Sequence, residues 1–255
     1  YTNRFVIFIQ VNLYRLKVMK DLKNWDKKTW ISSIKYISNF ILFFKKQIKF
    51  NQEIKILDIG CGRAKIISKF SQKYRLRYRP VGIDIIRHKN ISKKIRFIKI
   101  NALTYLKTTK EKFDVILFKQ SIHFFKLVEI KKILKFSKRN LKPNGKIIIL
   151  ALHPKKNYWP MFEVFKTKLM QSLKKDKKIL NLIKYNFKNY KINYFVFKVK
   201  ISKDAYLQMI KNRFTSCLLN LSSKELKNGM EEVKKKNKKK LIFNDKLICI
   251  SYIKK

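Results

Sequence analysis

Acidic residues, glycine, proline, cysteine and histidine are all scarce in this sequence. Its 255 residues include 15 acids, five glycines, four prolines, three cysteines and three histidines. The cysteines, Cys61, Cys217 and Cys249, lie far apart and show no paired spacing. This spacing argues against a disulfide framework or a zinc site and fits a reducing compartment. We therefore predict no metal site and a cytoplasmic protein.

Long apolar runs are also lacking. The stretch FVIFIQVNL, residues 5–13, is interrupted by Gln10 and Asn12 and is too short to span a bilayer. It also lacks a small-residue cleavage site of the secretory type. We expect no membrane span. The sequence begins with Tyr1 and leaves open whether its N-terminus is complete.

Positive charge and apolar residues are what the sequence has in abundance. Lys and Arg number 64, the formal net charge is +49, and 46% of the residues are hydrophobic. Such a chain can bury a core and is not disordered. The bases are spread evenly, and 54 lysines against 10 arginines indicate coding bias rather than a binding footprint. Incidental polyanion binding is expected, and a specific RNA or DNA partner remains the alternative.

Short apolar runs alternate with helical segments over the first part of the chain. Helical spacing covers 12–48, and five β-rich runs follow at 54–59, 80–86, 94–100, 113–118 and 145–150. The best-formed runs are apolar at nearly every position, as are strands buried on both faces of a parallel sheet. The alternation predicts a doubly wound α/β fold.

The last hundred residues show a mixed pattern. Helical segments are expected at about 155–190 and 204–234, and strands at 194–201 and 246–253. The lysine-rich stretch 234–240 is expected to be a solvated loop or helix end, and KPNGK, residues 142–146, a turn. We predict a helical cap, residues 1–48, and a main domain, residues 49–255, whose two helical segments cover a substrate.

Two of the five glycines stand together in ILDIGCGRAK, residues 56–65, directly after the first β-rich run. Glycine lets the chain turn sharply and lets a ligand approach the backbone, and the next helix offers unpaired N–H groups. Asp58 precedes the glycines, and Asp84 ends the second run, where an acid can accept hydrogen bonds from a ribose diol. Lys65 replaces the third glycine of a dinucleotide fingerprint, and the GK[ST] of a P-loop is absent. The pattern predicts a cofactor across the tip of the first strand.

The motifs ILDIGCGRAK, VGIDII, INALTYL, FDVILFKQSIHFF and LKPNGKIIIL resemble those of class I S-adenosylmethionine-dependent methyltransferases in order and spacing. The resemblance is to the small-molecule type of this family, with methyltransferase domains of type 11 and type 25. It covers about residues 50–151. It implies a Rossmann-like, mostly parallel seven-stranded sheet whose last strand, at 246–253, runs antiparallel. It also implies S-adenosyl-L-methionine as cofactor and methyl transfer as the reaction.

The resemblance further implies a set of cofactor-binding residues. Asp58, Gly60 and Gly62 would bind the methionine end, with Lys119 beside it. Asp84 would bind the ribose, Asn101 and Ala102 would flank the adenine, and Cys61 and Ile85 complete the set. Adenine-proximal positions in this family often carry an acid, so the asparagine at 101 weakens that contact.

A histidine is the natural general base if the methyl acceptor is a hydroxyl. His123, in KQSIHFF, follows the fourth run and would lie where cofactor and acceptor meet in this family, so we predict it as the catalytic residue. A histidine that merely packs between Phe124 and Phe125 is an equal alternative, and His153 is a weaker rival. A carboxylate acceptor would need no base.

The acceptor is expected to be a small molecule with an oxygen or nitrogen nucleophile, which includes a carboxylate. Segment 204–234 broadly resembles the helical cover of small-molecule members such as the trans-aconitate methyltransferase group, and its Arg213 could bind a carboxylate. Base-amino methyltransferases carry an Asn-Pro-Pro-Tyr-type tetrapeptide where this chain has FKQS, residues 118–121. This difference argues against the N6 amino group of a DNA or RNA adenine as the acceptor. The alternatives are an RNA methyltransferase, a nucleic-acid-binding protein, or a fold that binds the cofactor without catalysis.

Overall fold

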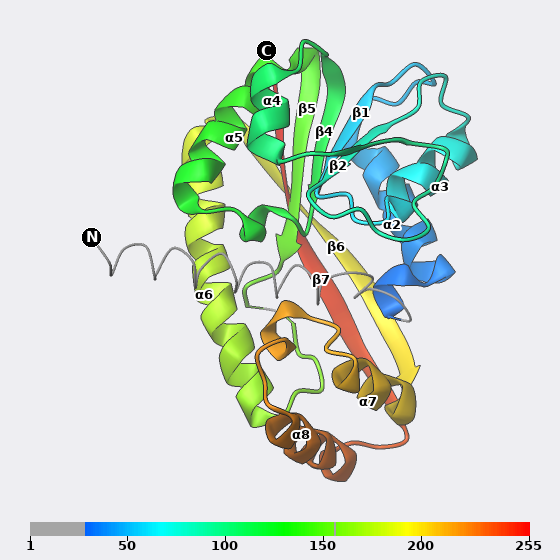
Figure 1. Ribbon diagram of the computed structural model, residues 1–255, viewed down its shortest axis with the longest axis vertical. Coiled ribbons are helices and arrows are strands. Elements are labelled where there is room, and N and C mark those ends of the chain that lie inside the picture. Colours follow the sequence, from blue (N-terminus) through cyan, green and yellow to red (C-terminus); the bar gives the residue numbers. More distant parts are fainter. Residues whose placement is uncertain (1–28, 156) are drawn as a thin grey trace.

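A seven-stranded sheet with helices on both faces forms the frame of the molecule (Figure 1). The computed structural model describes residues 29–155 and 157–255. The strands are β1 (Ile56–Ile59), β2 (Val81–Asp84), β3 (Arg96–Lys99), β4 (Phe113–Lys119), β5 (Leu141–Leu152), β6 (Tyr190–Ser202) and β7 (Lys240–Ile253). The α-helices are α2 (Ile34–Gln47), α3 (Lys65–Tyr74), α4 (Ala102–Thr108), α5 (Leu127–Arg139), α6 (Glu163–Asn186), α7 (Lys203–Lys211) and α8 (Ser223–Lys236). Short 3-10 helices are η1 (Trp30–Ser32), η2 (Ile122–Phe124) and η3 (Ser216–Leu218).

The strand order is β3-β2-β1-β4-β5-β7-β6. Neighbouring strands from β3 to β5 are parallel, and β7 is antiparallel to both β5 and β6. The predicted doubly wound, mostly parallel sheet with an antiparallel last strand is therefore confirmed. The direction of winding reverses between β1 and β4, which is where open α/β sheets bind ligands.

Apolar residues on both faces explain why the central strands are buried. All four residues of β1 are buried. Along β4, Val115 and Leu117 join the core that contains α2 and α3, whereas Ile116 and Phe118 join the core that contains α4 and α5. Figure 1 shows these two pairs of helices on opposite faces of the sheet. Because both faces are covered, the strands appear in the sequence as near-continuous apolar runs.

The predicted helix at 12–48 is interrupted in the part that the structure describes, and its first residues, 1–28, lie outside the described residues. After η1, Ser33 is extended and α2 starts at Ile34. The Ser33 hydroxyl accepts a hydrogen bond from the backbone N–H of Tyr36 at 3.2 Å. Ser33 is thus an N-cap, which gives α2 a start of its own.

The segment 204–234, predicted to be helical, is helical in three separate pieces. It divides into α7, η3 and α8. After α7, Arg213 adopts a left-handed conformation with a φ of 52°. Ser222 then caps α8, since its hydroxyl accepts from the N–H of Glu225 while the Glu225 carboxylate accepts from the N–H of Ser222. This reciprocal capping box starts a separate helix.

Residues 142–146, predicted as a turn, form a bulge at the start of β5. Phe113 pairs with Leu141 but Val115 pairs with Lys146, so β5 carries extra residues at this point. Asn144 has a φ of 59°, which asparagine tolerates better than most residues.

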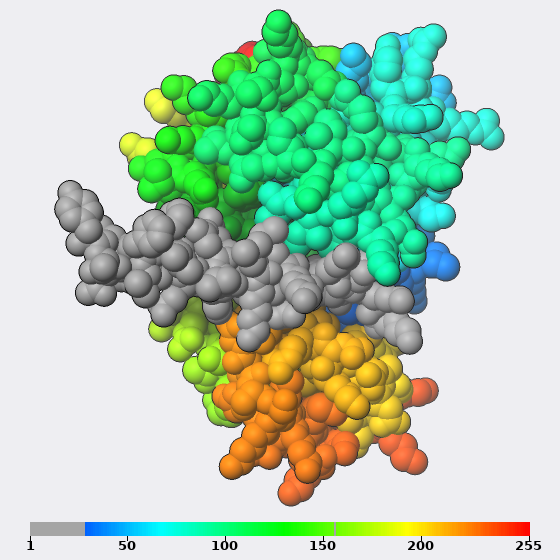
Figure 2. All heavy atoms as spheres, viewed as in Figure 1, coloured from blue at the N-terminus to red at the C-terminus, as the bar shows by residue number. Residues whose placement is uncertain are grey.

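The strands β6 and β7 extend beyond the carboxyl ends of the parallel strands. β5 ends at Leu152, which pairs with Leu247, and residues 240–246 of β7 continue in register with residues 196–202 of β6. This two-stranded ribbon leads to a lobe made of α7, η3 and α8. In Figures 1 and 2 the lobe lies below the sheet, at the end opposite α4.

Candidate functional site

A cleft of about 440 Å³ lies at the carboxyl ends of β1, β2 and β4. This is the position at which the winding of the sheet reverses. The nine residues that the sequence predicted for the cofactor all line it: Asp58, Gly60, Cys61, Gly62, Asp84, Ile85, Asn101, Ala102 and Lys119. The fold therefore brings together side chains from four separate parts of the chain.

Gly60 and Gly62 turn the chain sharply between β1 and α3. Their φ values are 70° and 54°, in the region that favours glycine. A Cβ on Gly60 would lie 2.5 Å from the Cβ of Ser121, whose hydroxyl donates to the carbonyl of Ile59 at 2.6 Å. A Cβ on Gly62 would meet no atom within 4 Å. Gly60 is thus required by packing and by φ, whereas Gly62 leaves its backbone open to a ligand.

Two other residues of the cleft have left-handed backbone although they are not glycine. Ala64, at the start of α3, has a φ of 53°, and Gln120, directly after β4, has a φ of 54°. The N–H of Gln120 donates to the carbonyl of Leu150 at 2.8 Å, which fixes this second turn. Residues held in such conformations cluster at functional sites, and both turns flank the same cleft.

Asp84 connects the tip of β2 to the glycine turn. One carboxylate oxygen accepts from the N–H of Gly62 at 2.9 Å, and the other accepts from the N–H of Ile86 at 3.0 Å. Each oxygen of a carboxylate can accept more than one hydrogen bond. The side chain therefore fixes the turn and keeps capacity to bind a hydroxyl donor.

Asp58 is the most deeply buried acid of the cleft, with 5% of its surface exposed. Burial raises its pKa from 3.8 to about 7, although Lys119 lowers it, and Asp84 adds a smaller increase. Burial also raises the pKa of the neighbouring Cys61 thiol, and a Cβ on Gly82 would lie 2.9 Å from its sulfur. Cys61 is therefore a packing residue at the edge of the cleft rather than a reactive thiolate.

Lys119 lines the cleft at the end of β4. Its ammonium group donates to Gln120 at 3.0 Å. It also lies 5.3 Å from the ring centre of Tyr36 and 5.4 Å from that of Phe40, both on α2. These cation–π contacts join the end of β4 to the helix that covers it.

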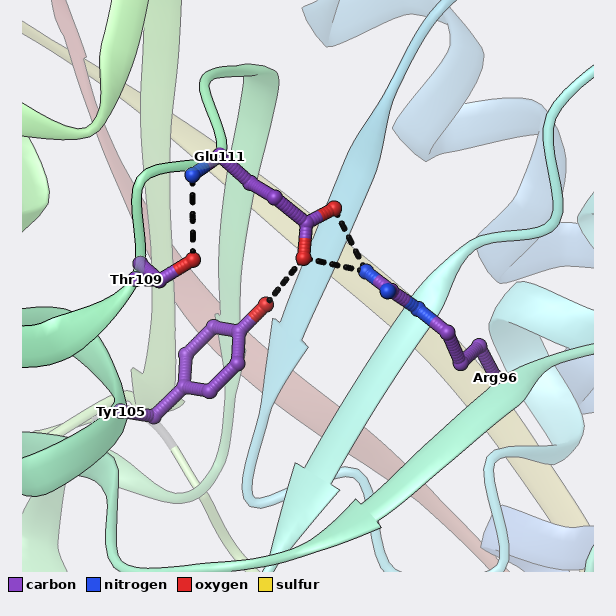
Figure 3. A network of polar contacts seen from close by, with 4 residues as sticks. All are labelled: Arg96, Tyr105, Thr109 and Glu111. Atoms are coloured by element: carbon purple, nitrogen blue, oxygen red, sulfur yellow. Dashed lines mark hydrogen bonds and ion pairs between the residues drawn. The ribbon is translucent and has the colours of Figure 1, made fainter.

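Asn101 is both a cleft residue and the N-cap of α4. Its side-chain oxygen accepts from the N–H groups of Leu103 and Thr104 at 2.8 and 3.3 Å, so its NH₂ group is the part left to face a ligand. Farther along α4, the Tyr105 hydroxyl donates to Glu111, which is held by Arg96 of β3 (Figure 3). This network fixes α4 on the sheet and, with it, the position of Asn101.

The comparisons with known proteins agree with this geometry. Residues 57–149 match the sequence profile of a family described as a methyltransferase domain. This match, which runs from β1 to β5, identifies a methyltransferase domain in the chain. No curated protein matches the sequence.

Several solved methyltransferase structures share the fold. A provisionally assigned methyltransferase from an antibiotic biosynthesis pathway of Anabaena variabilis has a TM-score of 0.61 at 11% identity, over 83% of this chain and 96% of that one. A SAM-dependent methyltransferase of Archaeoglobus fulgidus has a TM-score of 0.53 at 16% identity, over 86% and 94%. A provisionally assigned methyltransferase of Bacillus halodurans has a TM-score of 0.53 at 13% identity, over 84% and 98%. Because the sequence identities are this low, these structures show a shared fold and nothing more specific.

The cleft of this methyltransferase has the groups that S-adenosylmethionine requires. Asp58 and Asp84 are carboxylates at the tips of adjacent strands, suited to an ammonium group and a ribose diol. The NH₂ group of Asn101 can donate to an adenine edge, and the half-exposed Ile85 offers an apolar surface. When bound, the cofactor supplies a methyl group on a sulfonium centre.

Sequence reasoning missed the part of the cleft lining that comes from η1, α2 and the residues after β4. Ile31, Ser32 and Ile37 reach it from η1 and α2, and Phe124 and Phe125 reach it from η2 and the turn after it. Other lining residues that were not predicted are Arg63, Lys65, His88, Gln120, Ser121 and Glu129. The apolar spacing of α2 and the cap at Ser33 indicate a helix, but nothing local indicates which face would cover the cleft.

His123, predicted as the catalytic residue, does not line the cleft. Its ring contacts Phe124 at 4.2 Å between centres, and its carbonyl accepts from Lys175 at 3.4 Å. Burial, with Lys175 nearby, lowers its pKa from 6.5 to about 4. His153 is also outside the lining, since its Nδ1 accepts from the N–H of Lys155 and its ring contacts Tyr194. Neither histidine is among the residues that line the cleft.

Proposed function

We propose that this methyltransferase transfers the methyl group of S-adenosylmethionine to an oxygen or nitrogen atom of a small-molecule acceptor. The observation that carries the proposal is the apolar part of the cleft lining, the apolar wall. It consists of Ile31 and Ile37, which come from η1 and α2, and of Phe124 and Phe125, which follow β4 in the chain. A small, partly apolar molecule suits such a wall better than a nucleic-acid backbone does.

Cofactor binding is proposed to use the nine residues already named. Asp58 would pair with the amino group of the methionine part, Gly60 and Gly62 would give their backbone to it, and Lys119 would lie beside it. Asp84 would bind the ribose hydroxyls, and Asn101 would donate to the adenine. The contacts of Asp84 and Asn101 with backbone N–H groups support these roles, because they hold both side chains in place before the cofactor arrives.

The N-terminal segment and the lobe of α7 and α8 are proposed to cover the acceptor. Residues of η1 and α2 supply part of the apolar wall, which supports a role for the predicted cap of residues 1–48 in acceptor choice. Much of the catalysis would come from alignment of nucleophile, methyl carbon and sulfur. An acceptor that is already ionised would need no base from the protein. The same holds for a neutral acceptor that is itself nucleophilic.

A cytoplasmic location is part of the proposal. The three cysteines are unpaired thiols, which supports a reducing compartment. Among the described helices, none is long and apolar enough to cross a membrane.

Calorimetric titration with S-adenosylhomocysteine, followed by a screen of acceptors with labelled cofactor, tests the proposal. We expect one cofactor site per chain. Asp84→Asn should weaken binding roughly 10–100-fold, because the ribose hydroxyls lose a charged acceptor. Asp114→Asn is the matched control, since Asp114 stands at the other end of β4 and binds Lys142 and the N–H of Lys55.

Two results would contradict this function. Absence of cofactor binding at millimolar concentration would refute it outright. Labelled methyl groups that appear on one RNA, with an affinity that survives physiological salt, would favour the RNA methyltransferase instead, because incidental charge binding weakens steeply with salt.

A further inference from the structure

Several buried polar atoms behind the apolar wall of the cleft have no hydrogen-bond partner among the described residues. They are the Tyr36 and Tyr206 hydroxyls, the Trp159 indole nitrogen and one oxygen of Asp245. Their side chains are at least nine-tenths buried. Buried polar atoms in proteins are nearly always paired, so a group of unpaired ones in one place has unused hydrogen-bonding capacity.

Asp245 is the charged member of this group. It lies on the part of β7 that extends beyond the end of β5, and 1% of its surface is exposed. One carboxylate oxygen accepts from the Trp30 indole nitrogen at 3.1 Å, and the other has no partner within the described part of the chain. Burial raises its pKa to about 6, while the Trp30 hydrogen bond and Lys119 lower it.

Aromatic rings surround this carboxylate. Phe197 is its partner across β6 and β7, and the ring of Tyr36 contacts Phe197 at 5.1 Å between centres. The ring of Trp30 contacts Phe243, two residues from Asp245 on the same strand, at 5.3 Å, and Tyr206 at 6.4 Å. The arrangement is a carboxylate oxygen set among the faces and edges of rings.

The same short segment carries both this cluster and the cleft wall. Trp30 precedes Ile31, and Tyr36 precedes Ile37, and both isoleucines line the cleft. Lys119 lines the cleft as well, 5.3 Å from the ring of Tyr36. Asp245 does not itself line the cleft, but Trp30, which donates to it, directly precedes Ile31 of the lining.

We propose that Asp245, with Tyr36, forms the inner end of the acceptor site and selects an aromatic acceptor that carries a hydroxyl or amino group. The ring of the acceptor packs against the surrounding aromatic side chains, and its O–H or N–H donates to the unpaired oxygen of Asp245. The hydroxyl of Tyr36 supplies a second polar contact. An acceptor carboxylate is disfavoured because Asp245 repels it. This inference rests on the proposed function and narrows its acceptor class.

Binding of phenol, aniline and benzoate to the protein saturated with S-adenosylhomocysteine tests the inference. Ligand-observed NMR titration gives the affinity of each probe. We expect phenol and aniline to bind at least tenfold more tightly than benzoate. Asp245→Asn should reduce that preference at least tenfold, and Tyr36→Phe should weaken phenol binding severalfold. Asp176→Asn is the matched control, because Asp176 on α6 is also a buried carboxylate with an unpaired oxygen but has no hydrogen bond to Trp30.

The inference is overturned if benzoate binds as tightly as phenol, or if the preference survives in Asp245→Asn. Should Asp245→Asn fail to fold, Tyr36→Phe decides, since an unchanged phenol affinity in that variant overturns the role of the cluster. The labelled-methyl screen tests the proposed methyl transfer independently of probe binding. Probe binding that depends on Asp245 without any methyl transfer would refute the function and leave the binding site standing.

Discussion

Asp58 is expected to lose a proton when the methyltransferase binds its cofactor. In the free protein, burial raises the pKa of this carboxyl to about 7, against the opposing effect of Lys119. The ammonium group of the methionine part would pair with the carboxylate and lower its pKa, since a nearby opposite charge favours the ionised form. Binding at pH 6 should then release nearly one proton per site, and affinity should increase with pH.

The size of the effect follows from the ionised fraction. With a pKa of about 7, about 1% of free molecules carry the carboxylate at pH 5 and about 90% carry it at pH 8. If the pKa in the complex lies below 5, affinity should fall roughly 100-fold between pH 8 and pH 5. Asp58→Asn should abolish this dependence and weaken binding at pH 8 roughly 10–100-fold, because a charge-assisted hydrogen bond is lost.

Stability of the free protein should change in the opposite direction. A folded-state pKa raised above 3.8 means that the protonated carboxyl favours folding. That contribution is fully present below pH 3.8 and is lost as the pH rises to about 7. At about 1.36 kcal/mol per pH unit, the loss amounts to about 4 kcal/mol at most. Asp58→Asn should therefore stabilise the free protein at pH 8 by up to that amount and have little effect near pH 4.

Calorimetry in two buffers of different ionisation enthalpy counts the released proton, and denaturant unfolding at pH 4 and pH 8 measures stability. Asp114→Asn is again the control, because that carboxyl is half-exposed and lies at the other end of β4. Equal affinities at pH 5 and pH 8 in the unmodified chain would refute the reasoning. So would proton release that persists in Asp58→Asn, which would assign the ionisation to another group.

Two further predictions concern the glycine turn and the predicted base. Gly60→Ala should lower the free energy of unfolding by about 1–3 kcal/mol more than Gly62→Ala. Both glycines have positive φ, but only at position 60 would the new Cβ lie 2.5 Å from the Cβ of Ser121. Equal losses in denaturant unfolding would contradict the packing argument. His123→Ala should lower turnover less than tenfold, because the ring does not line the cleft. Turnover should show no His123 ionisation near pH 6.5, because the pKa of this ring is lowered to about 4. A loss of roughly 10²–10⁴-fold with unchanged cofactor affinity would restore His123 as the general base.

The sequence by itself determined the buried strands, the glycine turn and nine of the residues that line the cleft. Strands β1, β2 and β4 are buried on both faces, so their apolar runs were visible without a structure. Gly60 and Gly62 could be identified because a sharp turn from strand to helix needs positive φ, which few other residues adopt. Asp58 and Asp84 could be identified because an acid is rare in this chain and each stands at a strand tip. These are local requirements, and local requirements leave a pattern in the sequence.

Tertiary structure alone decided the rest of the cleft lining, which includes Ile31, Ile37, Phe124 and Phe125. The periodicity of α2 predicted a helix but not that Ile37 would face the cleft while Tyr36 faces Phe197. Asp245 could not be identified, since its burial depends on Trp30, which is 215 residues away in sequence. The raised pKa of Asp58 also depends on burial by the assembled sheet. Contacts between distant segments fix these properties, and such contacts impose no spacing on the residues that make them.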